Sequence, residues 1–158
     1  MNKSPQVALV QRRSDQPLVP YYDDESQLIN VKRPTRSGRR YQVNVDNVLI
    51  FNLAEGGLVT DFYLMIRKDL WQVREPFPPK PHPILLADLE FSKDAIDQKF
   101  FGASVTPWIV PETNQQRTAV RFFLSPESSH MEPIELSEGC IAFVEDGQLV
   151  GFYLDLSP

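Results

Sequence analysis

Apolar and polar residues alternate in short runs along most of this chain, a pattern typical of β-strands that bury one face. The clearest runs, Val48 to Phe51 and Phe62 to Leu64, belong to a strand-rich block from Tyr41 to Ile66. Further short strands are expected within the ranges Leu18 to Val31, Ile84 to Phe91, Val105 to Val110 and Thr118 to Leu124. The pattern therefore predicts a mainly β (α+β) fold.

One segment is expected to be helical. Ser92 is a suitable N-cap, with Asp94 in the first turn of a short helix that runs from Lys93 to Phe101 and ends at Gly102. Turns are expected at 23–26 and at 111–114, where turn-forming residues gather. Residues 1–17 are expected to form a polar, partly disordered lead-in.

Two stretches of the chain resemble each other at a distance of ninety positions. Residues 55–64 align without a gap on residues 145–154, and five of the ten positions are identical. Gly56-Gly57 and Asp146-Gly147 are both suited to a two-residue type I′ turn, in which both central residues have positive φ. We therefore predict two related hairpins, either from a duplication or as two ordinary hairpins that share common strand residues.

A two-residue turn fixes which residues face each other. It would place Leu53 opposite Thr60 and Phe51 opposite Phe62. In the second hairpin it would place Phe143 opposite Val150 and Ile141 opposite Phe152. The apolar faces would then consist of Leu49, Phe51, Leu53, Phe62 and Leu64, and of Ile141, Phe143, Val150, Phe152 and Leu154. We predict that these two faces pack into one sandwich- or barrel-like core.

The length of the chain suits one compact domain over residues 1–158. Its pseudo-repeat halves, about 18–75 and 84–158, would be joined by a connector at 76–83. Five of the eight connector residues are proline, which favours extended polyproline geometry and excludes helix or central strand.

Charge is unevenly distributed along the chain. Residues 1–40 hold eight Lys or Arg and four Asp or Glu, whereas residues 41–158 hold eight and seventeen, for a total of −5. An acidic body argues against general nucleic-acid binding. No apolar run approaches the length that spans a bilayer, and the single cysteine fits a reducing compartment, so we expect a cytoplasmic protein.

The sequence shows no catalytic constellation. His82, His130 and Cys140 lack partners at the spacing of a metal site or a nucleophile–base pair, and no phosphate loop or nucleophile elbow is present. We expect no metal and no cofactor, and the chain is more typical of a non-enzymatic protein than of an enzyme.

Two groups of polar residues are the candidates for binding. The first is a basic segment that could bind a phosphate or an acidic protein surface, or could only balance the acidic body: Lys32, Arg33, Arg36, Arg39 and Arg40. The second lies on the mixed faces of the hairpins and could line a pocket between the repeated halves: Asn52, Asp61, Tyr63 and Tyr153.

The segment 22–31 resembles the opening of a small bacterial family of domains of unknown function, which begins Tyr-Asp. Residues 146–152 are similar to its closing hairpin, Asp-x-Gly, two apolar residues and Gly, and residues 57–64 to a degraded copy of it. Gln27, Asp61, Tyr63 and Tyr153 depart from the family's acidic and glycine positions. The resemblance implies a β-rich fold and no known activity.

Two functions of different classes fit these observations. One is a protein-interaction or regulatory module that binds a protein partner or itself, such as an immunity- or antitoxin-like inhibitor or an accessory factor. The alternative is a small-molecule-binding or enzymatic β domain with a pocket between the repeated halves.

Overall fold

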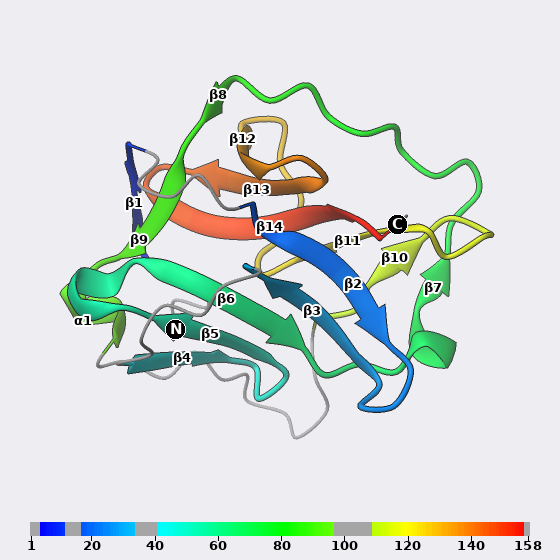
Figure 1. The fold of residues 1–158 in the computed structure, drawn as a ribbon. Helices are drawn as coiled ribbons and strands as arrows, with labels where there is room; N and C mark the ends of the chain where they lie inside the picture. The colour runs from blue at the N-terminus through cyan, green and yellow to red at the C-terminus, as the bar shows by residue number, and fades with distance from the viewer. Residues whose placement is uncertain (1–3, 12–16, 34–40, 97–108, 157–158) are drawn as a thin grey trace.

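Two large β-sheets and one small sheet make up most of the computed structural model, which describes residues 4–11, 17–33, 41–96 and 109–156 (Figure 1). The five-stranded sheet has the order β2 (Val19–Asp23), β3 (Leu28–Lys32), β6 (Val59–Leu64), β5 (Leu49–Leu53) and β4 (Tyr41–Val45). The seven-stranded sheet has the order β7 (Gln72–Val73), β10 (Glu112–Thr113), β11 (Ala119–Phe123), β14 (Gln148–Asp155), β13 (Cys140–Glu145), β12 (Glu132–Ser137) and β8 (Leu85–Leu86). The small sheet pairs β1 (Val7–Val10) with β9 (Asp88–Phe91).

Helical structure is confined to short segments in the described residues. Two 3₁₀ turns, η1 (Glu55–Gly57) and η2 (Lys68–Leu70), flank β6, and α1 (Lys93–Ile96) follows β9. The predicted N-cap is confirmed, because Ser92 Oγ accepts a hydrogen bond of 3.2 Å from the Ala95 N–H. The predicted continuation of this helix to Phe101, and the first part of the strand predicted at 105–110, lie outside the described residues.

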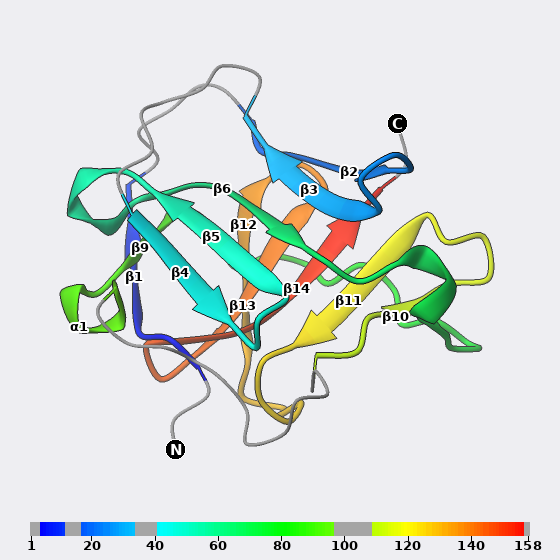
Figure 2. The ribbon, with the colours of Figure 1, turned by 90° about the horizontal axis from the view of Figure 1, so that it is seen from below.

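The two large sheets stack face to face and enclose the main core (Figures 1 and 2). Aromatic rings from both sheets meet there. The rings of Phe62 and Phe152, one from each large sheet, lie 4.5 Å apart, and the ring of Phe91 from the small sheet lies 4.8 Å from that of Phe51. The prediction of a mainly β, sandwich-like fold with one short helix is therefore confirmed.

The first predicted hairpin is β5–β6, and its core face is confirmed, since Phe51 faces Phe62 and all five predicted residues are buried. Its turn is not the two-residue type I′ turn. A bulge places Leu53 opposite Val59 instead of Thr60, and the Ala54 N–H bonds to the Leu58 carbonyl across a longer loop that contains η1. Within this loop, the backbone of Gly57 packs directly against the backbone of Phe91.

The second predicted hairpin is β13–β14, and here the turn is right. Asp146 and Gly147 have φ values of 51° and 74°, as type I′ requires. A bulge beyond the turn shifts the register by one residue, so that Phe143 faces Gly151 and Ile141 faces Tyr153. The predicted register is wrong from that point, because one extra residue moves the following side chains to the other face of the strand pair.

The register shift changes which side chains enter the main core. Phe152 and Leu154 lie there as predicted, but the facing strand contributes Cys140 and Ala142. Ile141, Phe143 and Val150 lie instead in a second apolar cluster on the outer side of the sheet. Because both faces of β13 are apolar, the sequence pattern did not penalise either register. The duplication itself stays a prediction.

Three smaller predictions are also corrected. Within the predicted lead-in, Val7–Val10 forms β1, and the Val7 N–H bonds to the Gly147 carbonyl at 2.9 Å. Glu112–Thr113 is a strand and not a turn, and the turn follows at Asn114–Arg117. The predicted strand at 84–91 divides into β8 and β9, which join different sheets.

The Pro-rich connector links the two edges of the seven-stranded sheet. It leaves β7 at one edge and reaches β8 at the other, along the upper side of the molecule in Figure 1. The backbone attaches at its ends, where the Arg74 N–H bonds to the Thr113 carbonyl at 3.0 Å and the Ile84 N–H to the Pro133 carbonyl at 2.9 Å. The seven-stranded sheet thus takes β7 from before the connector and its other six strands from after it.

Two adjacent glycines allow a test of the close approach at Gly57. A Cβ at residue 57 would lie 2.3 Å from the Phe91 carbonyl oxygen, whereas nothing lies within 4 Å of one at residue 56. Both residues have positive φ, so an alanine at either position strains the backbone. Gly57→Ala adds a clash with Phe91, whereas Gly56→Ala does not. We expect Gly56→Ala to lower the free energy of unfolding by about 1 kcal/mol and Gly57→Ala by at least about 3 kcal/mol in urea titrations. Equal losses in the two variants would contradict the packing described for Gly57.

Candidate functional site

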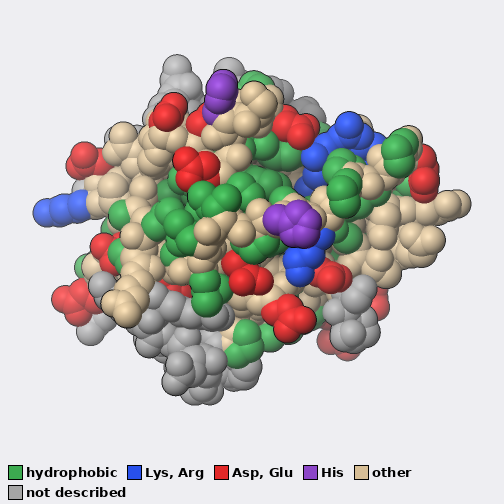
Figure 3. Space-filling view, turned by 90° about the horizontal axis from the view of Figure 1, so that it is seen from above, with side chains coloured by type: hydrophobic (Ala, Val, Ile, Leu, Met, Phe, Trp, Pro, Cys, Tyr) green, Lys and Arg blue, Asp and Glu red, His purple; other side chains and the backbone are tan. Residues whose placement is uncertain are grey.

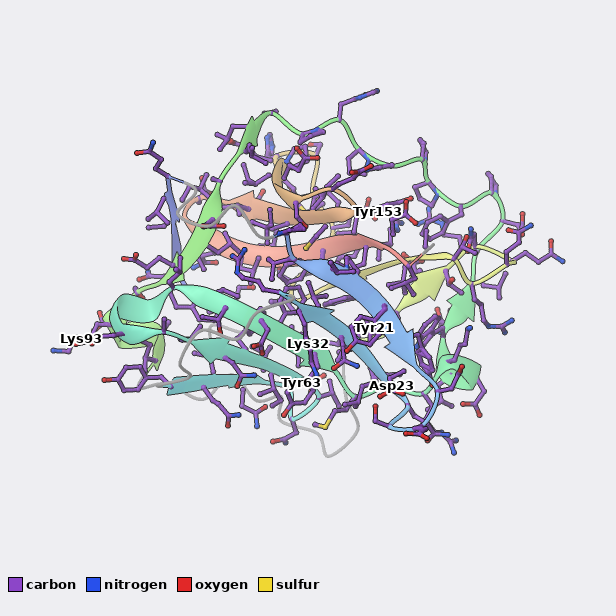
Figure 4. All side chains as sticks on the ribbon, in the orientation of Figure 1. Tyr21, Asp23, Lys32, Tyr63, Lys93 and Tyr153 are labelled. Atoms are coloured by element: carbon purple, nitrogen blue, oxygen red, sulfur yellow. The ribbon has the colours of Figure 1, made fainter. Side chains whose placement is uncertain are left out.

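The four residues of the predicted pocket lie on two different sheets. Phe62 and Phe152 point into the core, and side chains alternate along a strand, so Tyr63 and Tyr153 point outward on opposite sides of the sandwich. Figure 4 shows Tyr153 at the seven-stranded sheet and Tyr63 at the five-stranded sheet. The structure therefore does not bring Tyr153 together with the other three residues.

Asn52 and Asp61 belong to a row of linked side chains on the outer side of the five-stranded sheet. Gln42 Nε2 donates to Asn52 Oδ1 at 3.1 Å, Asn52 Nδ2 donates to Asp61 Oδ1, and Thr60 Oγ1 donates to the Asn52 carbonyl at 3.0 Å. Asn52 is buried, so these bonds satisfy polar groups that would otherwise be costly to bury. The row joins β4, β5 and β6, so the polar character of these residues is explained by hydrogen bonding between neighbouring strands.

The predicted basic segment divides into residues with different surroundings. Lys32 is exposed at the end of β3. The side chain of Arg33 is buried, and its Nη2 lies 3.3 Å from Asp88 Oδ1, with the two side chains only 7% and 1% exposed. Arg36, Arg39 and Arg40 lie outside the described residues. The charge of Arg33 is therefore used in an ion pair inside the protein and is not presented to a partner.

Cys140 is fully enclosed in the core. Burial raises the pKa of its thiol well above the ordinary range, and the charge of Arg33 lowers it only in part. A nucleophilic cysteine needs an accessible thiolate, so this residue is suited to packing and not to covalent chemistry. His82 and His130 are both exposed. Among the residues that the structure describes, no group of three His, Cys, Asp or Glu side chains could hold a metal ion.

The outer side of the seven-stranded sheet carries the second apolar cluster, which includes Tyr153. The rings of Phe123 and Phe143 stack at 5.6 Å, and Phe77 of the connector lies 6.0 Å from Tyr153. Gly151 leaves room for this arrangement, because a Cβ there would lie 2.8 Å from the Phe123 ring. Burial, followed by the charge of Asp155, raises the pKa of the Tyr153 hydroxyl. Tyr153 is thus covered by the connector.

Arg121 is a buried cation at the border of this cluster, and it is not among the candidate residues predicted from the sequence. Its Nε donates to Glu112 at 3.0 Å and its Nη1 to Glu127 at 3.2 Å, while its guanidinium lies 5.2 Å from the Phe123 ring centre. Arg74, next to the connector, also pairs with Glu112, at 3.5 Å. An Arg within the apolar run of residues 119–123 was the only available signal, and its carboxylate partners are not adjacent in sequence.

The most exposed apolar residues in this part of the molecule lie on β8 and just before it. Ile84, Leu85 and Leu86 are 57%, 42% and 48% exposed. β8 is an edge strand, and on its inner side it pairs in parallel with β12, where Ile134 faces Leu85 and Glu135 faces Leu86. Figure 3 shows hydrophobic side chains gathered on this side of the molecule, with both acidic and basic side chains around them. We call residues 84–86 the apolar edge.

Comparisons with known proteins do not assign this surface. No family model matches the chain, and no curated protein matches it. The resemblance to a bacterial family of unknown function therefore stays a prediction. Within the described ranges, the chain contains no helix that is both long and apolar enough to cross a membrane.

Adjacent cations of the predicted basic segment allow a direct test of their roles. Arg33→Met removes the buried cation that pairs with the Asp88 carboxylate and should lower the free energy of unfolding by roughly 3 kcal/mol. Lys32→Met changes an exposed residue and should stay within about 0.5 kcal/mol of wild type. Urea titration followed by circular dichroism measures both. A small loss in Arg33→Met would contradict a structural role for this ion pair.

The burial of Cys140 predicts its reactivity. In native buffer at pH 8, a disulfide reagent such as DTNB should label the chain only at the rate at which the core opens, because the thiol is enclosed and its raised pKa keeps thiolate scarce. In 8 M urea, labelling should be complete within the mixing time of a manual assay. Fast labelling of the folded chain would contradict the placement of Cys140.

Proposed function

We propose that the protein is a non-enzymatic interaction module that binds a partner protein through the apolar edge. The observation that carries this proposal is the exposure of three consecutive large apolar side chains on an edge strand. Edge strands of native proteins are usually shortened, charged or covered, because their free backbone groups pair with other chains. An uncharged apolar edge is therefore well suited to a bound strand.

The partner that fits this edge is an extended segment of another protein. Such a segment adds a strand to the sheet through main-chain hydrogen bonds, and its apolar side chains cover residues 84–86. β8 is short, so the side chains would contribute more to affinity than the main-chain ladder. The module would therefore select a segment with apolar residues at the contacted positions.

Charge favours a basic partner over a second copy of this chain. The neighbouring strand β12 carries Glu132, which is exposed, and Glu135, which is half-buried and lies beside Leu86. The whole chain has a net charge of −5. Two copies would repel each other, whereas Lys or Arg residues in a partner would be attracted and would associate faster. An immunity- or antitoxin-like inhibitor of a basic protein, or an accessory factor, would need such a surface.

A matched pair of variants tests the apolar edge. Leu85 on β8 and Val73 on β7 are 42% and 44% exposed at opposite edges of the same sheet. A Lys at either position should leave folding stability within about 0.5 kcal/mol of wild type. Leu85→Lys places a charge in the middle of the proposed contact, so we expect it to lower the affinity for a purified partner by tenfold or more. Val73→Lys should bind the partner with wild-type affinity.

The partner is first identified by co-purification from a native lysate, and its affinity for the three chains is then measured by isothermal titration calorimetry. Hydrogen exchange of the complex should show new protection at residues 84–87. Retained affinity in Leu85→Lys would place the binding site elsewhere. A wild-type chain that dimerises through β8, or that stays monomeric and recovers no partner, would overturn the proposal.

A further inference from the structure

A separate pocket of about 250 Å³ lies between the end of β6 and the segment that leads to β10. Its floor includes the buried side chains of Val48, Ile66 and Ile109. Met65, Leu70 and Val110 also line it and are 42%, 56% and 42% exposed. An apolar floor with an exposed apolar rim is the usual character of a small-molecule site.

Hydrogen bonds hold the backbone around this pocket in place. The Met65 N–H bonds to the Val48 carbonyl at 2.8 Å, and Trp71 Nε1 donates to the Ile66 carbonyl at 3.0 Å. From the opposite side, the Ile109 N–H donates to Asp46 Oδ2 at 2.9 Å. Four of the residues that line the pocket, Val48, Met65, Ile66 and Ile109, thus have hydrogen-bonded backbone groups, so the pocket is largely formed before a ligand arrives.

One charged side chain, Arg67, is among the residues that line the pocket. Its guanidinium lies 3.4 Å from Asp69, but the two side chains are 55% and 69% exposed. Exposed ion pairs of this kind contribute little, because water solvates both charges. A ligand anion whose chain is held in the pocket could therefore replace Asp69 as the partner of Arg67.

We propose that this pocket binds a small amphipathic carboxylate of the medium-chain fatty-acid class. The alkyl chain lies on the apolar floor formed by Val48, Ile66 and Ile109, and the carboxylate pairs with Arg67. The size fits, since a cavity of roughly 150 Å³ already holds benzene, and the present one has room for an alkyl chain of several carbons. This site is independent of the apolar edge, and the two can be tested separately.

Calorimetric titration of the full chain with hexanoate, heptanoate and octanoate, below their micellar concentrations, tests the apolar part of the site. Each added methylene should tighten binding roughly threefold to fourfold, because it leaves water for the pocket. Octanol should bind more weakly than octanoate, because it lacks the charge that Arg67 recognises. Absence of saturable octanoate binding, or equal affinity for octanol, would overturn the proposal.

Three variants test the anchor and the rim. Arg67→Ala should lower the affinity for octanoate about fivefold and leave the affinity for octanol unchanged. Asp69→Asn should raise the affinity for octanoate about twofold, because it removes a competing carboxylate. Leu70→Glu places a charge on the rim and should abolish binding of both ligands. The matched control is Arg74→Ala, since Arg74 is also an exposed cation paired with a carboxylate, at Glu112, but does not line the pocket.

The position of the ligand can be read from Trp71, whose indole N–H bonds to the carbonyl of the pocket residue Ile66. Octanoate should shift the Trp71 indole resonance in ¹⁵N spectra of wild type, and Trp71→Phe assigns that resonance. An unchanged Trp71 signal at saturating octanoate, or equal weakening in Arg67→Ala and Arg74→Ala, would show that the ligand binds elsewhere.

Discussion

The packing of aromatic rings between the two sheets is the interaction on which the rest of the structure depends. Phe51 and Phe62 come from one sheet and Phe152 from the other, and the Phe62 and Phe152 rings meet at 4.5 Å. These contacts fix which face of each strand is inward. The next residue of each strand is then necessarily outward, which places Tyr63 and Tyr153 on opposite surfaces. A pocket shared by the two tyrosines is incompatible with this core.

The seven-stranded sheet is apolar on both faces, and this sets what must lie on its outer side. One face belongs to the main core, and the other carries Phe143, Val150 and Tyr153. Antiparallel sheets commonly leave one face to water. The central strands of this sheet are antiparallel, but the connector covers their outer face through Phe77. Burial by the connector ends at β8, where the apolar side chains are exposed again. The proposed docking surface therefore begins where the internal cover stops.

The sequence predicted the fold class, the core face of β5–β6 and the type I′ turn at Asp146-Gly147, because each follows from local pattern or turn chemistry. It did not predict the bulge near Val150, since both registers of β13 bury apolar side chains. The sequence also did not predict that residues 84–86 are exposed, because a continuous apolar run is typical of a buried strand. Arg33 and Asp88 are fifty-five positions apart, and such pairings depend on the tertiary fold. The sequence pattern therefore predicted which face of its strand each pocket candidate lies on. It did not predict that Tyr153 and Tyr63 lie on opposite sides of the sandwich.

The connector also relates the width of the sheet to the length of the chain. It passes from one edge to the other of seven strands, whose six spacings of about 4.8 Å amount to roughly 29 Å. The ten steps from residue 74 to residue 84 span roughly 31 Å in polyproline geometry at about 3.1 Å per residue, but only roughly 15 Å as a helix. Only the extended form reaches across. The prolines therefore keep the connector extended to a length that matches the width of the sheet. A sheet one strand wider would need a longer connector.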